Sequence, residues 1–154
     1  ELEYIDLSKA VDAKNLSKNL KGLKWITSKN PNNPPQELEN LKQVVNFLKK
    51  EKKNKTLITD YQILAPISDI YDFSPNQWHH PSVSFPLKGQ KYFKVYKNYF
   101  IQNIKKNKIE FIYETTENEN TITELIIDKE CFKQIRMSKI LVRLDLIKNC
   151  KDLK

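Results

Sequence analysis

Glycine is nearly absent from this chain of 154 residues, which holds only Gly22 and Gly89. Phosphate-binding loops, dinucleotide-binding turns and the nucleophile elbow of hydrolases all require glycines at fixed spacing. The sequence therefore excludes nucleotide-phosphate binding through a glycine-rich loop and a Gly-x-Ser-x-Gly nucleophile.

Long apolar runs are missing as well. No stretch approaches the roughly 20 residues that a transmembrane helix needs, and no basic start is followed by an apolar signal segment. Apolar residues still make up 39% of the chain, which is enough for a core. The length predicts a single domain over residues 1–154, with an irregular N-terminal segment (1–35) and an α/β core (36–154).

Arginine is scarce although the net charge is +8. Among 27 basic residues, only Arg136 and Arg143 are arginines, and the lysines are spread along the whole chain. Proteins that read nucleic acids favour arginine for bidentate contacts to phosphate and guanine. We therefore interpret the lysine-rich composition as codon bias and do not expect a nucleic-acid partner.

Histidine is limited to the adjacent pair His79 and His80. Neighbouring side chains point in different directions in an extended chain, and a zinc site normally has three or four protein ligands. The sequence therefore predicts no metal site, and no other cofactor is expected.

Two cysteines, Cys131 and Cys150, lie close together near the C-terminus. Their even number and short separation permit one disulfide, which could stabilise the fold by about 3 kcal/mol. Two unpaired thiols in a reducing compartment are an equally good interpretation. Neither cysteine has the neighbours that mark a reactive thiol.

Apolar periodicity predicts two amphipathic helices, from Gln36 to Lys50 and from Gln90 to Lys106. Short apolar runs rich in β-branched residues predict the strands. These strands are expected at Thr56–Asp60, Ile109–Tyr113, Ile122–Ile127 and Ile140–Ile147.

The order of these elements predicts an α/β fold with a small mixed sheet. The second helix would cross between two parallel strands as a βαβ unit, helices would pack on the sheet, and the C-terminal strands would form an antiparallel edge. Residues 61–89 are predicted as a long ordered loop. A short helix within Tyr61–Tyr71, broken by Pro66, is the alternative.

The first group of candidate binding residues follows the strand that ends at Asp60. Sheets of α/β proteins place ligand-contacting groups at the carboxyl ends of their strands, so Asp60, Tyr61 and Gln62 are candidates. Asp60 could act as a general base or accept a hydrogen bond from a sugar hydroxyl. Alternatively, its side chain caps the next turn.

The second group lies in the long loop, where Asn76, Trp78, His79 and His80 are close in the sequence. An aromatic side chain flanked by polar groups is typical of sites for carbohydrates or aromatic ligands. Trp78 as an anchor of the loop is the simpler interpretation.

Several short runs resemble a known class of proteins. They are Gly22–Thr27 (GLKWIT), Pro35–Glu39 (PQELE), Leu57–Gln62 (LITDYQ), Ser74–Trp78 (SPNQW), Lys91–Phe93 (KYF) and Tyr96–Phe100 (YKNYF). In this order they resemble the C-terminal soluble domain of bacterial multi-pass membrane glycosyltransferases of the C-type (GT-C) class, similar to dolichyl-phosphate-mannose-protein mannosyltransferases. The likeness covers most of the chain, including the late cysteine pair.

This resemblance implies an accessory domain at the extracytoplasmic (periplasmic) face of the membrane, non-catalytic when isolated and contributing to acceptor or saccharide binding. Catalysis in that class belongs to acidic residues on loops between transmembrane helices, with a polyprenyl-phosphate sugar as donor. The implied partners are the transmembrane part of a parent chain and a saccharide or polyprenyl-phosphate sugar substrate. A Cys131–Cys150 disulfide would fit such an oxidising compartment.

Two alternatives to this interpretation stay open. The first is a stand-alone small α/β enzyme that uses Asp60 with His79 or His80, with the cytoplasm as the alternative location. The second is an interaction module that uses its basic surface. The residues alone do not decide whether the chain is an enzyme.

Overall fold

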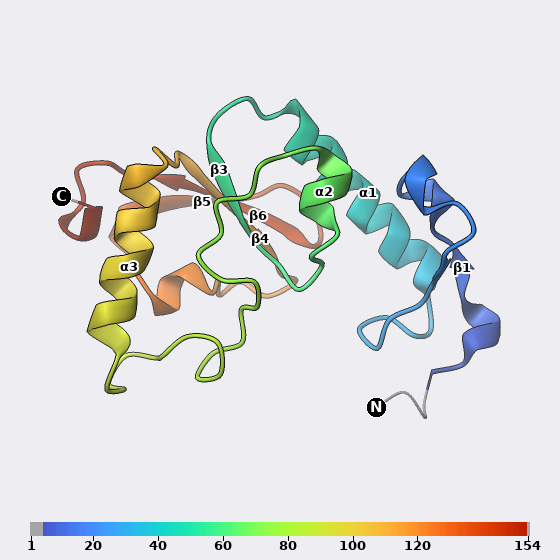
Figure 1. Cartoon of the computed structure of the whole chain (residues 1–154), viewed down its shortest axis with the longest axis horizontal. Coiled ribbons are helices and arrows are strands. Elements are labelled where there is room, and N and C mark those ends of the chain that lie inside the picture. The colour runs from blue at the N-terminus through green and yellow to red at the C-terminus, as the bar shows by residue number, and fades with distance from the viewer. Residues whose placement is uncertain (1–4, 154) are drawn as a thin grey trace.

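The computed structural model describes residues 5–153, so the first four residues of the segment predicted as irregular lie outside the described residues. In this part of the chain a mixed sheet of strand order β3-β4-β6-β5 lies between two layers of helices (Figure 1). β3 (Lys55–Ile58) is parallel to β4 (Phe111–Thr115). β6 (Leu141–Leu146) is antiparallel to both β4 and β5 (Phe132–Arg136). The predicted α/β fold, with its parallel unit and antiparallel C-terminal edge, is confirmed.

Helix α1 (Pro34–Lys50) covers one face of the sheet. It begins two residues earlier than predicted because prolines are compatible with the first helical turn, and the Asn33 side chain caps the backbone N–H of Gln36 at 3.3 Å. Its apolar stripe packs against strand residues that point to the same face. The buried residues of this cluster include Leu38, Leu41, Val44, Leu48, Leu57, Phe111, Tyr113 and Leu141.

A second, short helix on the same face, α2 (Leu64–Ser68), lies in the segment predicted as a loop. Pro66 does not break this helix because it occupies the first turn, where a backbone N–H has no helical partner. The long connection between α2 and the next helix contains only an isolated bridge, between Pro81 and Phe85. The loop interpretation is therefore wrong for α2 and correct for most of the rest.

Helix α3 (Phe93–Lys106) packs on the opposite face and connects the parallel strands β3 and β4, as predicted (Figure 1). Its buried side chains Phe100 and Ile104 belong to a cluster with Ile112 of β4 and Val142 of β6. The core is thus divided into two clusters, one on each face of the sheet, because neighbouring residues of a strand point to opposite faces.

The predicted strand Ile122–Ile127 is wrong. This stretch contains the 3-10 turn η5 (Thr123–Leu125), followed by η6 (Lys129–Cys131). The backbone N–H groups of Ile122 and Thr123 donate to the carboxylate of Glu114 instead of to a neighbouring strand. The strand that the prediction lacks is β5. Its exposed residues Lys133 and Gln134 are adjacent, so the sequence shows no clear alternation of apolar and polar residues there.

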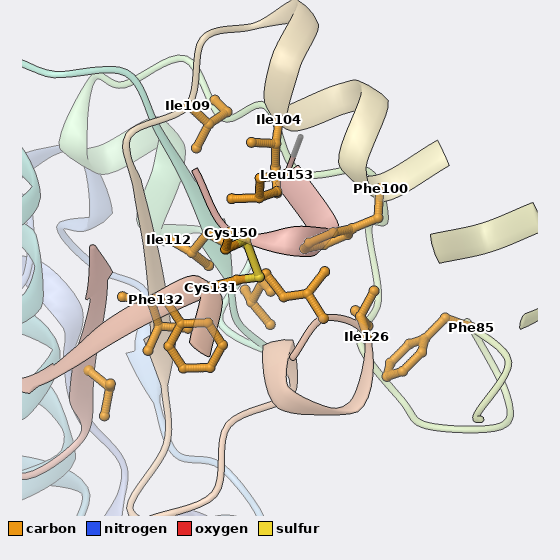
Figure 2. Close-up of a cluster of buried hydrophobic side chains, with 14 residues drawn as sticks. Phe85, Phe100, Ile104, Ile109, Ile112, Ile126, Cys131, Phe132, Cys150 and Leu153 are labelled. Carbon is orange, nitrogen blue, oxygen red and sulfur yellow. A yellow bond between two sulfur atoms is a disulfide. The ribbon is translucent and has the colours of Figure 1, made fainter. Parts of the chain in front are cut away.

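A disulfide joins Cys131 to Cys150, with the two Cα atoms 5.1 Å apart. Figure 2 shows it among large apolar side chains of α3, the sheet and the turns. We call this cluster the disulfide core. Its buried members include Phe85, Phe100, Ile104, Ile112, Ile126, Cys131, Phe132, Cys150 and Leu153, the last from the 3-10 turn η7 (Lys151–Leu153).

The N-terminal segment contains one short strand pairing and several 3-10 turns. β1 (Val11–Asp12) pairs antiparallel with β2 (Lys24–Trp25). The 3-10 turns of this segment are η2 (Leu7–Lys9), η3 (Ala13–Asn15) and η4 (Lys18–Leu20). None of the described helices is both long and apolar enough to cross a lipid bilayer.

Candidate ligand-binding site

A polar cleft of about 600 Å³ opens at the carboxyl ends of β3 and β4. Its lining comes from the residues that follow β3, from the end of β4 and the loop behind it, and from the start of α1. The carboxyl ends of the strands are where α/β proteins commonly bind ligands. The cleft is therefore the candidate ligand-binding site.

The two strand ends are tied together below the cleft. The hydroxyl oxygens of Thr59 and Thr115 are 2.6 Å apart, and the backbone N–H of Tyr61 donates to the Thr59 hydroxyl at 3.0 Å. These bonds fix the turn that presents Asp60 and Tyr61 to the cleft. The floor of the site is therefore preformed.

One wall is organised around Glu37, a buried carboxylate in the first turn of α1. Glu37 accepts hydrogen bonds from Trp25 Nε1 (2.9 Å), Thr27 Oγ1 (2.7 Å) and the Tyr61 hydroxyl (2.7 Å). Burial, together with this bond to a carboxylate, raises the pKa of Tyr61 well above its usual range. The phenol therefore stays a donor, and the network attaches the N-terminal segment to the cleft.

Asp60 and Lys29 form an ion pair at the mouth of the cleft, with Nζ 2.5 Å from Oδ2. The Lys29 ammonium also lies 5.0 Å from the centre of the Tyr61 ring. Both charged side chains are partly exposed, so a ligand can reach them. Among the described residues, Lys29 is the hydrogen-bonding partner of the Asp60 carboxylate, which caps no backbone N–H there.

Glu114 on β4 shapes the opposite wall, although its side chain is buried. It accepts from the backbone N–H groups of Ile122 (2.7 Å) and Thr123 (2.8 Å), and from the Thr123 hydroxyl. Burial raises the pKa of Glu114, while these bonds oppose the rise. Its role is structural: it holds the stretch at Thr121 against the cleft.

The rim formed by residues 116–120 is held from β5. Arg136 donates from its guanidinium to the carbonyl oxygens of Thr116 and Asn118, both at 2.6 Å. The side chain of Gln134 donates to the carbonyl of Glu119 at 2.9 Å. Polar strand residues that look unsuited to a sheet thus position a loop that lines the site.

Two buried polar atoms at the cleft have no hydrogen-bond partner. Across residues 5–153, four buried side-chain atoms lack one, and His79 Nδ1 and Thr121 Oγ1 are the two that belong to residues lining the cleft. His79 is 4% exposed and Thr121 is 3% exposed. Leaving such groups unsatisfied costs about 1–3 kcal/mol each. Since both residues line the cleft, His79 and Thr121 are candidate contacts for a polar ligand.

The His79 ring is neutral at physiological pH. Its Nε2 lies 3.1 Å from the Ser74 hydroxyl, and the backbone of Thr59 also acts on the ring. Burial lowers the pKa of His79 to about 4, although the negative charge of Asp60 acts to raise this pKa. A neutral imidazole can donate or accept one hydrogen bond at Nδ1.

The structure brings most of the sequence-predicted residues to this region. Asp60, Tyr61 and His79 line the cleft. Gln62 and Asn76 line a smaller adjoining cavity of about 220 Å³, to which His79 and Thr59 also contribute. The Gln62 side chain donates to the carbonyl of Gln77 at 3.1 Å, which holds the long loop beside β3.

Trp78 and His80 line neither cavity and are exposed. The Trp78 side chain is 54% exposed. Its neighbours Gln77 and His79 both contribute to the cavities, so Trp78 stands next to the site in the chain.

Sequence reasoning missed Glu37, Glu114 and Thr121. A signal existed for the first two. Glu37 shares the helical stripe of Leu41 at i+4, and Glu114 shares a strand face with Ile112, so each carboxylate stands at a position where the pattern expects an apolar residue. Thr121 carried no such signal, because its burial depends on the Glu114 contacts.

In the described part of the chain, no group of three or more His, Cys, Asp or Glu side chains could hold a metal ion. Comparison with protein families, with curated proteins and with solved structures finds no significant match. The glycosyltransferase resemblance therefore stays a hypothesis, and the geometry of the cleft is the basis for a functional proposal.

Proposed function

We propose that this chain is an accessory binding domain of a membrane glycosyltransferase-like protein and holds a saccharide in the cleft at the carboxyl ends of β3 and β4. The carrying observation is the pair of buried, unpartnered atoms His79 Nδ1 and Thr121 Oγ1 beside the same cleft. Polar atoms of this kind become favourable contacts when a hydroxyl-rich ligand satisfies them.

The chemistry of the lining favours a neutral, polyhydroxylated ligand. Hydroxyl, amide and carboxylate groups surround the cleft, and each sugar hydroxyl can donate and accept hydrogen bonds. A phosphate group would need several available cations. Lys29, one of the two lysines of the lining, is already paired with Asp60, which leaves Lys139.

The disulfide supports an extracytoplasmic location, because such bonds persist mainly in oxidising compartments. In this proposal the chain would work beside the transmembrane part of its parent. The saccharide would be the acceptor or the sugar of a polyprenyl-phosphate donor. Catalysis would belong to the parent.

A second candidate function is a small enzyme that uses Asp60 with His79. It is favoured by one observation: both side chains line the cleft, and the Asp60 charge acts on the His79 ring. A neutral His79 could accept a proton from a ligand hydroxyl. Conversion of a bound saccharide by the isolated chain would support this function over the accessory role.

The test is a titration of the 15N-labelled protein with mono- and disaccharides, followed by NMR. We expect shifts to concentrate on the backbone amides of residues 59–61 and 121–123. Replacing Asp60 by Ala should weaken binding at least about tenfold, which corresponds to the loss of about 1.4 kcal/mol. Thermal stability should stay nearly unchanged, since exposed ion pairs contribute at most about 1 kcal/mol.

Glu130→Ala is the matched control, because Glu130 is an exposed carboxylate outside the cleft lining. It should leave saccharide affinity unchanged. No shift with any saccharide, or shifts confined to other surfaces, would contradict the proposal. A large loss of stability in Asp60→Ala would mark Asp60 as a structural residue instead.

A further inference from the structure

Acidic residues are absent from a long segment that includes α3. Between Asp72 and Glu110 the sequence contains seven lysines and neither aspartate nor glutamate. These lysines are Lys88, Lys91, Lys94, Lys97, Lys105, Lys106 and Lys108. Four of them lie in α3, and no acidic residue of the segment offsets their positive charge.

The outer side of α3 also exposes large apolar side chains. Tyr92, Val95 and Tyr99 follow one another at spacings of three and four residues and are 62%, 68% and 51% exposed. The inner side of the same helix is occupied by Phe100 and Ile104 in the disulfide core. The outer residues are thus not needed for the core of the domain.

The loop before α3 extends this surface. The Gln90 side chain donates to the Ser82 hydroxyl at 3.2 Å and accepts from the backbone N–H of Leu87 at 2.7 Å. These bonds hold the loop tip, where Val83 is 85% exposed, beside the start of the helix. We call the combined region the outer α3 surface. It consists of Val83, Lys88, Lys91, Tyr92, Lys94, Val95 and Tyr99.

Three of its members, Lys88, Lys91 and Lys94, are exposed and take part in none of the ion pairs found among residues 5–153. The Lys91 ammonium instead lies 5.2 Å from the centre of the Tyr92 ring. In contrast, Lys97 on the same helix pairs with Asp152 at 2.8 Å. The charge of the outer α3 surface is therefore available to an external partner.

We propose that the outer α3 surface docks on an anionic lipid membrane. Charge complementarity selects an anionic partner, and the exposed tyrosines and valines fit the boundary between headgroups and acyl chains. Lysines beside such a surface gain electrostatic attraction without needing the bidentate geometry for which nucleic-acid readers use arginine.

The docking would also orient the cleft. Since α3 crosses between two parallel strands, it runs antiparallel to them, and its first turn lies at the same end of the sheet as the carboxyl ends of β3 and β4 (Figure 1). A membrane at Lys88 and Tyr92 would therefore lie at the end of the domain where the cleft opens. The docking itself does not depend on the proposed saccharide.

The test is flotation of the full chain with lipid vesicles at low ionic strength. One set contains phosphatidylcholine alone, and the other contains about 30 mol% phosphatidylglycerol. We expect binding to the anionic vesicles only, and its loss at high salt. The triple variant K88Q/K91Q/K94Q should bind about 100-fold more weakly, because each lysine near an anionic surface contributes about fivefold.

The matched control is K42Q/K49Q/K52Q, which removes the same charge from exposed positions on and after α1, on the opposite face of the sheet. It should change vesicle binding by less than about threefold. The variant Y92S/V95S/Y99S should also bind weakly while keeping its thermal stability, since all three side chains are exposed.

Equal losses in both lysine variants would overturn the proposal, since net charge alone would then explain binding. So would the absence of binding to anionic vesicles at low salt. Tighter binding to a short DNA duplex than to vesicles, lost in K88Q/K91Q/K94Q, would assign the surface to nucleic acid. The variant T121V should bind vesicles normally, which separates this test from that of the cleft.

Discussion

The disulfide core and the cleft at the carboxyl ends of β3 and β4 both contain residues of the sheet, but their buried side chains differ in polarity and in hydrogen bonding. In the disulfide core, apolar side chains surround a covalent link between Cys131 and Cys150 (Figure 2). In the cleft, buried His79 and Thr121 each keep a polar atom without a partner. Apolar packing and the disulfide stabilise the first region. In the second, the unpartnered polar atoms lower the stability of the fold, and we expect a bound ligand to offset that loss.

The strongest way to test this contrast is to remove the disulfide. The double variant C131A/C150A should lose about 3 kcal/mol of unfolding free energy, because the link closes a loop of about 20 residues in the unfolded chain. Chemical denaturation with and without reductant measures the loss. Saccharide affinity should stay within about twofold, since the cleft lining excludes both cysteines. An unchanged denaturation midpoint would show that the disulfide core does not need its link.

Glu114→Gln tests the contact between the two regions. The carboxylate accepts three hydrogen bonds from Ile122 and Thr123, and an amide NH₂ facing these donors would leave some of them unsatisfied. We expect a loss of about 2 kcal/mol in chemical denaturation, together with weaker saccharide binding. If stability falls and affinity does not, Glu114 serves the fold without shaping the cleft.

The buried His79 predicts a pH dependence with a definite sign. Its folded-state pKa of about 4 lies below the unfolded value of 6.5, so its contribution to stability is full above pH 6.5 and is lost as the pH falls toward about 4. Between pH 7.5 and pH 5.5, this residue alone should lower the unfolding free energy by about 1.4 kcal/mol. Denaturation of His79→Gln should show a smaller fall, whereas His80→Gln, which changes the exposed neighbour, should behave like wild type.

Thr121→Val is expected to change the stability least of these variants, and it alters a single hydroxyl group. Valine has nearly the same shape and lacks the hydroxyl, so the variant should be more stable by about 1 kcal/mol. Ser68→Ala removes another buried, unpartnered hydroxyl, which lies outside the cleft, and should also stabilise the fold. Loss of stability in Thr121→Val would mean that its hydroxyl already has a partner, such as an ordered water.

Regular elements with strong periodicity could be predicted from the sequence. The stripe of α1, that of α3 and the β-branched runs of β3, β4 and β6 correspond directly to the buried faces of the structure. The same logic failed where a tertiary contact overrides the local pattern. Ile122–Ile127 has the composition of a strand. Its first backbone N–H groups, however, donate to the Glu114 carboxylate, and the chain forms the 3-10 turn η5 there.

The candidate site was predictable only in part, for a related reason. Asp60 and Tyr61 could be found because they directly follow a strand, a position with a general meaning in α/β sheets. Glu37 is placed by tertiary contacts such as that with Trp25, and Glu114 holds the stretch that follows Thr121, contacts that no local pattern reveals. The role of β5 was hidden too, because Arg136 serves the rim of the cleft through its guanidinium.

The most direct test of the cleft as a ligand site is to compare saccharide affinity in Thr121→Val and Ser68→Ala by NMR titration. Both variants should be stabilised, but only Thr121→Val should bind saccharide more weakly, by about tenfold, since it removes a ligand contact. Equal affinity in wild type and both variants would show that the unpartnered hydroxyl does not face a ligand. That result would contradict the account of the cleft given above.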